Sequence, residues 1–152
     1  MSDTDNQLID SIAAGVVKAI PEAIIFADLK GAVRYWNRGA AEIFGFTADE
    51  AMGQSLDLII PERMRQAHWD GYYKAIELGD TYSGRGSRVT RSLHKEEGRS
   101  LYVDMSFAIV KDNDGKVIGS LAVARDATER FTAEKEMRKQ IAALSVTGEK
   151  KA

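Results

Sequence analysis

The 152-residue sequence has no cysteine and only two prolines and two histidines. Without cysteine, the chain has no disulfides, zinc–thiolate sites, iron–sulfur clusters or thiol nucleophiles. Two histidines give no basis for a serine–histidine–acid catalytic set. No apolar run approaches the roughly 20 residues that cross a bilayer, and the N-terminal stretch 1–5 lacks the basic region of a signal peptide. We therefore expect a cytoplasmic protein without thiol chemistry.

An excess of either charge is also missing. The 21 lysines and arginines nearly balance the 23 aspartates and glutamates, which leaves a formal net charge of −2. Domains that bind nucleic acid usually present a dominant basic face. The charge balance and the lack of long apolar runs therefore predict that neither nucleic acid nor a membrane is a partner.

Helical and strand patterns follow one another along the chain. An amphipathic helix is predicted for 1–21, and a longer helix begins at Pro61 and ends near Leu78. The predicted strands are 23–27, 32–36, 82–94, 101–109 and 117–125. We expect an α+β fold, in which a five-stranded antiparallel sheet carries short helices over one face, with a pocket between them. The domain would span 22–127, flanked by the N-terminal helix and by a C-terminal signalling or dimerisation helix with a frayed tail at 128–152.

A helix in the middle of the chain carries a histidine on its apolar face. Met64, His68, Gly71, Tyr72 and Ala75 recur at spacings of three and four, so they share one face. An imidazole on such a face is either a hydrogen-bonded core group or a metal ligand. A cofactor that brings its own metal, such as heme, needs only one such ligand from the protein. The role of His68 therefore decides what this protein does.

Several local motifs resemble those of one known family. They are AVRYWN at 32–37, AAEIFGFT at 40–47, GQS at 53–55, IPER at 60–63, the turn at 95–98 and DATER at 126–130. With the order of elements, these motifs resemble the PAS sensory domain over roughly residues 23–130. The last motif is similar to the family's Asp-x-Thr junction, in which Asp126 and Thr128 would couple the final strand to an outgoing helix. The resemblance implies a fold whose members bind heme, flavins or small metabolites, or nothing.

The helix after Pro61 resembles one branch of that family more closely. Its pattern Pro-Glu-x-x-Arg-x-x-His is similar to the segment that bears the heme ligand in oxygen-sensing histidine kinases with heme PAS domains. His68 falls on the ligand position without a gap. The resemblance implies that heme b is the cofactor and that His68 is the axial ligand of its iron.

Other residues of this helix would then surround the heme. Gly71 lacks a side chain and would let the porphyrin approach, while Met64 and Tyr72 would line the slot. The resemblance implies that Lys74 lies near a propionate, and the weaker propionate candidates are Tyr82 and Arg65. The commoner role of such cations is to remain on a solvated helix face.

The strand at 101–109 would supply the opposite, distal side. Met105 and Phe107 lie on its apolar face. Phe107 would be either core or a steric gate. Met105 could be a sixth iron ligand, because a thioether is a known heme ligand, although methionine more often simply fills a core.

The sequence leaves three residues open as the distal neighbour of a bound gas. One inserted residue in the turn places Arg88 at the position of the kinases' distal arginine, whereas counting back from Gly98 without a gap places Val89 there. The alternation of Val89 with Leu93 instead predicts that Arg91 points inward. An arginine would favour oxygen through a charge-assisted hydrogen bond, whereas a valine would suit CO or NO.

We therefore expect a heme-based sensor of oxygen, CO or NO that signals through its terminal helices. It would form a homodimer and act on a signalling effector, such as a histidine kinase, outside this sequence. The alternatives are a PAS dimerisation module without heme and a PAS domain that binds a small metabolite or a flavin without a cysteinyl adduct. A sensor is favoured over an enzyme, and a small heme enzyme is a minor alternative because no distal acid–base residue is evident.

We expect His94, the other histidine of the chain, to lie in water.

Overall fold

A computed structural model of the chain describes residues 2–81 and 86–151. Its helices are α1 (Asp3–Ala19), α2 (Arg38–Phe44), α3 (Ala48–Ala51), the 3-10 turn η1 (Leu56–Leu58), α4 (Glu62–Leu78) and α5 (Thr128–Lys151). Its strands are β1 (Ala23–Asp28), β2 (Val33–Trp36), β3 (Arg88–Ser92), β4 (Leu101–Lys111) and β5 (Val117–Asp126). Within the described ranges, every helix is too short or too polar to span a lipid bilayer.

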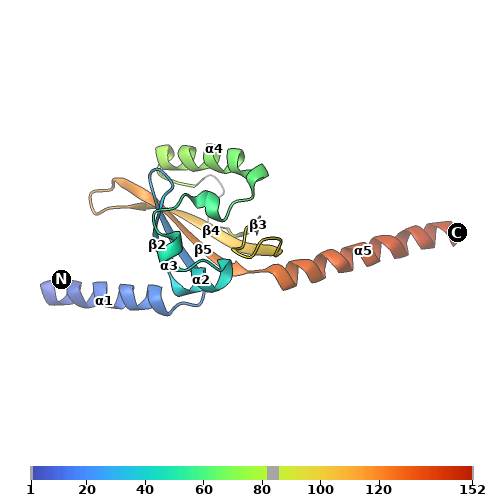
Figure 1. Ribbon diagram of the computed structural model, residues 1–152, viewed down its shortest axis with the longest axis horizontal. Helices are drawn as coiled ribbons and strands as arrows, with labels where there is room; N and C mark the ends of the chain where they lie inside the picture. Colours follow the sequence, from blue (N-terminus) through green and yellow to red (C-terminus); the bar gives the residue numbers. More distant parts are fainter. Residues whose placement is uncertain (1, 82–85, 152) are drawn as a thin grey trace.

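The five strands form one antiparallel sheet in the order β2-β1-β5-β4-β3. The two early strands join the three late ones as the sequence predicts, and β5 lies at the centre. Figure 1 shows the helices between β2 and β3 beside the sheet, while α1 and α5 extend away from it at opposite ends. The predicted fold class is therefore confirmed.

Local sequence signals explain where the short helices begin and end. The Asn37 side chain accepts a hydrogen bond from the backbone N–H of Ala40 and caps α2. Thr47 and Glu50 form the capping box that begins α3. The left-handed backbone of Gly79 (φ 72°) ends α4. These caps hold the segment between β2 and β3 in a series of turns over the sheet.

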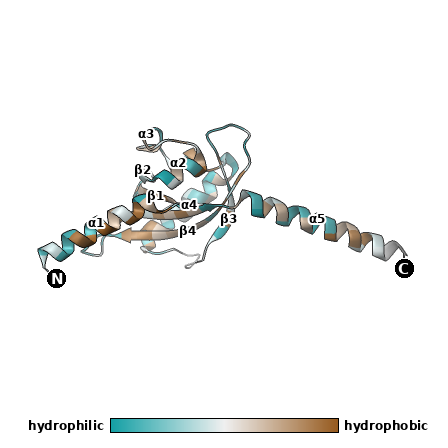
Figure 2. Cartoon of the chain, turned by 90° about the horizontal axis from the view of Figure 1, so that it is seen from below, coloured by the Kyte–Doolittle hydropathy of each residue, from teal (hydrophilic) through white to brown (hydrophobic). Residues whose placement is uncertain are grey.

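The two terminal helices expose apolar side chains. On α1 these are Leu8, Ile9, Ile12 and Val16, and on α5 they are Met137, Ile141, Leu144 and Val146. Figure 2 shows the hydrophobic residues of both helices outside the body of the domain. An amphipathic helix gains most of its stability when its apolar stripe is covered. Both helices thus offer apolar surface to a partner.

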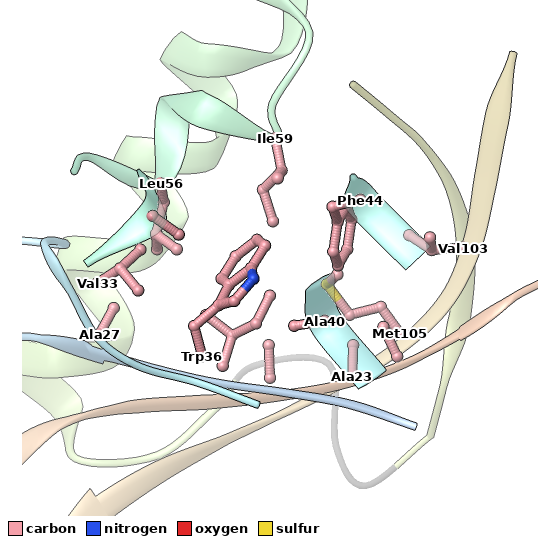
Figure 3. Close-up of a cluster of buried hydrophobic side chains, with 14 of the residues drawn as sticks. Ala23, Ala27, Val33, Trp36, Ala40, Phe44, Leu56, Ile59, Val103 and Met105 are labelled. Atoms are coloured by element: carbon pink, nitrogen blue, oxygen red, sulfur yellow. The ribbon is translucent and has the colours of Figure 1, made fainter. Parts of the chain in front are cut away.

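The core lies between the short helices and one face of the sheet. Trp36 and Phe44 pack with ring centroids 5.5 Å apart, and the Trp36 Nε1 donates to the Phe46 carbonyl at 2.9 Å. Val103 and Met105 of β4 close the same cluster, as Figure 3 shows. These side chains fill the place where the sequence predicts a pocket between the short helices and the sheet. That prediction is therefore wrong for this part of the fold.

The segment that follows β3 also differs from expectation. His94 is half-buried instead of lying in water, because its imidazole packs on Gly45, where an added Cβ would stand 2.6 Å from the ring. The backbone N–H of Lys95 donates to the carbonyl of Phe44 at 2.9 Å. This hydrogen bond holds the turn against α2 and thereby places His94 next to the end of that helix. The early part of the predicted strand 82–94 lies at 82–85, outside the described residues.

Candidate functional site

Helix α4 is fixed to the sheet by Tyr72 and Trp69. The Tyr72 hydroxyl donates to the carbonyl of Asp28 at 2.5 Å, and the Ser120 hydroxyl lies 3.3 Å from it. Trp69 lies directly over Gly31 in the β1–β2 turn, because a Cβ at Gly31 would stand 2.2 Å from the indole ring. The sequence predicts the shared face of α4 but not the contact of Trp69 with that turn.

His68 lies on the other side of Tyr72 from Trp69. At about 100° per residue, Trp69 and His68 flank Tyr72 on α4, so His68 is on the flank turned away from the β1–β2 turn. Its ring meets the Trp69 ring edge-on at a centroid distance of 4.8 Å and an angle of 81°. The tilted Tyr72 ring lies 5.8 Å away. His68 is thus half-buried and surrounded by aromatic side chains.

One nitrogen of His68 lacks a hydrogen-bond partner. Its Nδ1 is enclosed, and no group of the described residues donates to it or accepts from it. Buried polar atoms of folded proteins nearly always have a partner. The interpretation of His68 as a hydrogen-bonded core histidine therefore does not fit the structure at this atom.

The surroundings of His68 favour its neutral form. Burial lowers the pKa of the imidazole, and the carboxylate of Asp57 partly offsets this by raising it. Histidine binds a metal only as the neutral base. The pKa shift therefore keeps His68 in the form that can act as a ligand at neutral pH.

The lowered pKa predicts how stability depends on pH. As the pH falls below the ordinary value of 6.5, the unfolded chain takes up a proton before folded His68 does. The stability that neutral His68 contributes is thus present above pH 6.5 and is lost as the pH falls through the folded-state pKa, with a slope of at most about 1.4 kcal/mol per pH unit. Denaturant titrations between pH 7.5 and 5.5 measure this slope.

A matched pair of variants isolates the contribution of His68. The pKa of His94 is also lowered, first by burial and then by Arg99, so His94 adds a slope of the same sign. His68→Gln should reduce the slope of the unfolding free energy against pH to the part that His94 contributes. His94→Gln should reduce it to the part that His68 contributes. An unchanged slope in His68→Gln would contradict the proposed burial of a neutral imidazole.

The other predicted residues of α4 differ in their surroundings. Met64 is half-buried beside His68, whereas Gly71 is exposed and a Cβ there would meet open space. Lys74 is exposed and lies about 200° around the helix from Tyr72, so its propionate role stays a prediction. Tyr82 lies outside the described residues.

Arg65 is already engaged with the protein. Its guanidinium donates to the carbonyls of Ile60 at 3.1 Å and Asp57 at 3.3 Å, and it lies 3.7 Å from the Asp57 carboxylate. These contacts tie the start of α4 to η1. Arg65 is thus a structural cation of this junction, and a propionate would have to compete with them.

The register of β3 and β4 places the three distal candidates on two different faces of the sheet. Arg88 pairs with Met105, whereas Val89 pairs with Asp104 and Arg91 pairs with Tyr102. Cross-strand partners share a face, so Arg88 lies on the same face as the buried Met105, although Arg88 itself is exposed at the start of the strand. The prediction that Arg91 points inward is wrong, because Arg91 pairs with Tyr102 on the face of the sheet opposite to Met105.

The error over Arg91 comes from the end of β3. The alternation of Val89 with Leu93 requires Leu93 to lie in the strand, but β3 ends at Ser92. Ser92 is buried, its hydroxyl donates to the Ile59 carbonyl at 2.7 Å, and the Leu93 N–H donates to the same oxygen at 2.9 Å. Ser92 is therefore the last residue of the strand. Leu93 lies outside it, so the apolar side chain of Leu93 cannot be used to infer which residues of β3 face the core.

Phe107 lies where the sheet is no longer covered by the helices packed on this face. It lies two residues beyond Met105 on the same face of β4 and pairs with Ala122 of β5. Met105 is 6% exposed, whereas Phe107 is 43% exposed. A large aromatic side chain is therefore left uncovered on the face that elsewhere carries the core. This uncovered area is a surface on which a flat apolar ligand could bind.

The described residues contain no cluster of metal-ligating side chains. No group of three or more His, Asp or Glu side chains in the described part of the chain could hold a metal ion. The two best-formed hollows lie elsewhere, one between the β1–β2 turn and the β4–β5 hairpin and one beside the start of α5. A metal site at His68 would thus require a cofactor that supplies the remaining ligands itself.

Asp57 is the residue at this site that the sequence analysis missed. Its Oδ1 accepts a hydrogen bond from the Trp69 Nε1 at 2.8 Å. The two residues are 12 positions apart, in a 3-10 turn and a helix, and no periodic pattern links them. The only local signal is an acidic residue two positions after Ser55, whose hydroxyl caps that turn.

Comparisons with known proteins agree with this fold. A family model described as the PAS fold matches residues 17–131. The chain is 24% identical over 144 residues to the oxygen sensor protein DosP of Escherichia coli K12, covering 95% of this chain and 18% of DosP. It is 25% identical over 119 residues to the biofilm dispersion protein BdlA of Pseudomonas aeruginosa, covering 78% of this chain and 27% of BdlA. The chain thus spans about a fifth to a quarter of these relatives.

Solved structures show the same architecture. A PAS domain from Colwellia psychrerythraea superposes with a TM-score of 0.69 at 22% identity, covering 80% of this chain and 98% of that domain. An RNA-binding light-oxygen-voltage receptor superposes with a TM-score of 0.71 at 19% identity, covering 90% of this chain and 38% of the receptor. These likenesses show the same fold, and the match of the family model to residues 17–131 establishes that the chain belongs to the PAS family of sensory domains.

Proposed function

We propose that this PAS domain binds heme through His68 and senses a diatomic gas. The observation that carries the proposal is the half-buried imidazole of His68, whose enclosed Nδ1 has no partner among the described residues. Enclosure of Nδ1 leaves Nε2 as the nitrogen for a ligand. Similarity to a protein named as an oxygen sensor supports the same function.

The described residues fit heme better than a bare metal ion. A bare ion needs several protein ligands, and the described residues offer no such group. Heme requires one axial base and apolar surface, which His68, Met64 and the uncovered Phe107 would provide. When bound, heme would supply an iron atom that coordinates a diatomic gas.

Two residues of the sheet would act on the gas side. Arg88 would offer a charged hydrogen-bond donor, because it lies on the helix-facing side opposite Met105. This favours oxygen over CO among the gases that the sequence leaves open. Met105 is buried within the core cluster, so its part as a sixth ligand stays a prediction, which a change of coordination number in Met105→Leu would support.

Replacing Arg88 tests the choice of gas. Arg88→Leu should speed oxygen dissociation by about 10-fold, because it removes a charge-assisted hydrogen bond of roughly 1.5 kcal/mol. CO dissociation should change little, since CO accepts hydrogen bonds poorly. Flash photolysis of both complexes measures the two rates. Arg91→Leu is the matched control because Arg91 lies on the opposite face; equal effects of the two variants would contradict the assignment.

The terminal helices would carry the signal. The side-chain hydroxyl of Thr128, at the start of α5, accepts from the Tyr102 N–H at 2.9 Å, and Phe131 stacks on Tyr102 with centroids 4.2 Å apart. A shift of β4 would therefore reach α5 directly. The exposed apolar stripes of α1 and α5 would hold two copies together as a homodimer and pass the change to an effector such as a histidine kinase.

A second candidate is a flavin-binding sensor. One solved neighbour, a light-oxygen-voltage domain described with a flavin analogue, superposes with a TM-score of 0.59 at 14% identity. The absorption spectrum of the purified protein separates the candidates. A Soret band after addition of hemin supports heme, flavin bands support this alternative, and a colourless protein in excess hemin supports a dimerisation module without cofactor.

A further inference from the structure

Trp69 is the centre of an aromatic cluster on α4. Its ring lies 4.8 Å from His68, 5.4 Å from Tyr72 and 5.7 Å from Tyr73, and it stacks on Tyr73 at 27°. Edge-to-face and offset-stacked pairs at these distances are favourable. Because Trp69 meets His68 edge-on at 81°, a rotation of the indole would change the space open to the imidazole.

The position of the Trp69 ring is held from two further sides. Its Nε1 donates to Asp57 Oδ1 at 2.8 Å, and Arg65 holds both the carbonyl and the carboxylate of Asp57 in place. On its other side the ring lies against Gly31, whose φ of 78° and lack of a Cβ make the close approach possible. The indole therefore has little freedom to rotate.

His68 has no comparable polar support of its own. A metal-binding histidine normally donates its second ring N–H to an acceptor that fixes the orientation of the ring. In the described residues Nδ1 of His68 has no such acceptor. The contacts with Trp69 and Tyr72 are thus what limits rotation of the imidazole.

We infer that Asp57 and Trp69 are positioning residues that orient the His68 ring for its ligand. The Asp57 carboxylate fixes the indole, and the indole edge fixes the imidazole. The inference rests on the proposed function only in naming heme as the ligand. The orientation of His68 itself is a property of the heme-free chain and can be measured without any cofactor.

The first experiment uses the heme-free protein. Trp69→Phe keeps an aromatic ring but removes the N–H donor, and Asp57→Ala removes the acceptor. NMR of the His68 ring should show shifted carbon and nitrogen resonances and faster ring motion in both variants. The double variant should show no more than either single change, because both break the same hydrogen bond. Asp57→Asn keeps an acceptor oxygen and should restore the wild-type signals.

Tyr73→Phe is the matched control, because it leaves the stacking on Trp69 and removes only an exposed hydroxyl. It should leave the His68 signals unchanged. Thermal unfolding shows which variants are folded, and Trp69→Phe alone decides the question if Asp57→Ala does not fold. Wild-type His68 signals in folded Trp69→Phe would overturn the inference.

A second experiment measures hemin affinity in the same variants. Loss of a supporting residue typically weakens metal binding by 10- to 100-fold, so we expect about 10-fold weaker binding in Asp57→Ala and near wild-type binding in Asp57→Asn. If the wild-type chain binds no hemin, the proposed function fails while the NMR result still decides the positioning. If it binds hemin and Asp57→Ala binds equally well, the positioning inference fails alone.

Discussion

His68→Ala is expected to weaken hemin binding by more than about 100-fold, beyond what losing a merely supporting residue costs. His68 would be the one axial base, because the other histidine, His94, packs on Gly45 in the turn after β3. Any hemin that still associates should lack the absorption bands of a histidine-ligated iron. Absorbance titrations of both proteins with hemin measure the affinity and the spectrum together.

His94→Ala is the matched control, since it removes the other histidine of the chain. His94 packs on Gly45, and its Nδ1 already accepts from the Glu96 N–H at 2.9 Å. We therefore expect wild-type hemin affinity in this variant. Imidazole added to His68→Ala should restore part of the spectrum. Equal affinities in His68→Ala and the wild type would refute the assignment of the ligand.

Phe44→Ala is expected to destabilise the fold by about 3–5 kcal/mol. Phe44 is 0% exposed and packs on Trp36 in the core cluster (Figure 3), so its removal leaves a cavity that the surrounding structure fills only in part. Urea denaturation at pH 8 measures the loss, at a pH where neither histidine is charged.

Phe107→Ala makes the same substitution on the uncovered part of the sheet. Phe107 is 43% exposed, so the loss of buried apolar area is smaller and we expect a cost of about 1 kcal/mol in the heme-free protein. The same variant should bind hemin more weakly if the uncovered area forms part of the cofactor site. Similar costs for the two variants would contradict the described boundary of the core.

Much of the fold was predictable because its signals are local. The capping box of Thr47 and Glu50 and the glycine at position 79 each act within a few residues, and the structure places helix ends at both. The alternation of apolar residues in β4 holds from Leu101 to Met105. Such patterns depend on the backbone next to them, which the sequence shows directly.

The site was less predictable because it depends on contacts between distant segments. The sequence marks His68 but does not show that its Nδ1 lacks a partner. Likewise, Ser92 at the end of β3 is held by a hydrogen bond to Ile59, 33 residues away, and the pairing of β3 with β4 places Arg88 on the face of Met105 and Arg91 on the opposite face. The Asp57–Trp69 hydrogen bond joins two elements whose relative position only the folded chain defines.

The absorption spectrum of the purified wild-type protein, titrated with hemin, tests the central claim most directly. We predict saturable binding of one hemin per chain with a sharp Soret band that shifts when oxygen or CO is added to the reduced protein. No Soret change beyond that of free hemin, with the protein folded and hemin in excess, would contradict the claim that His68 holds heme.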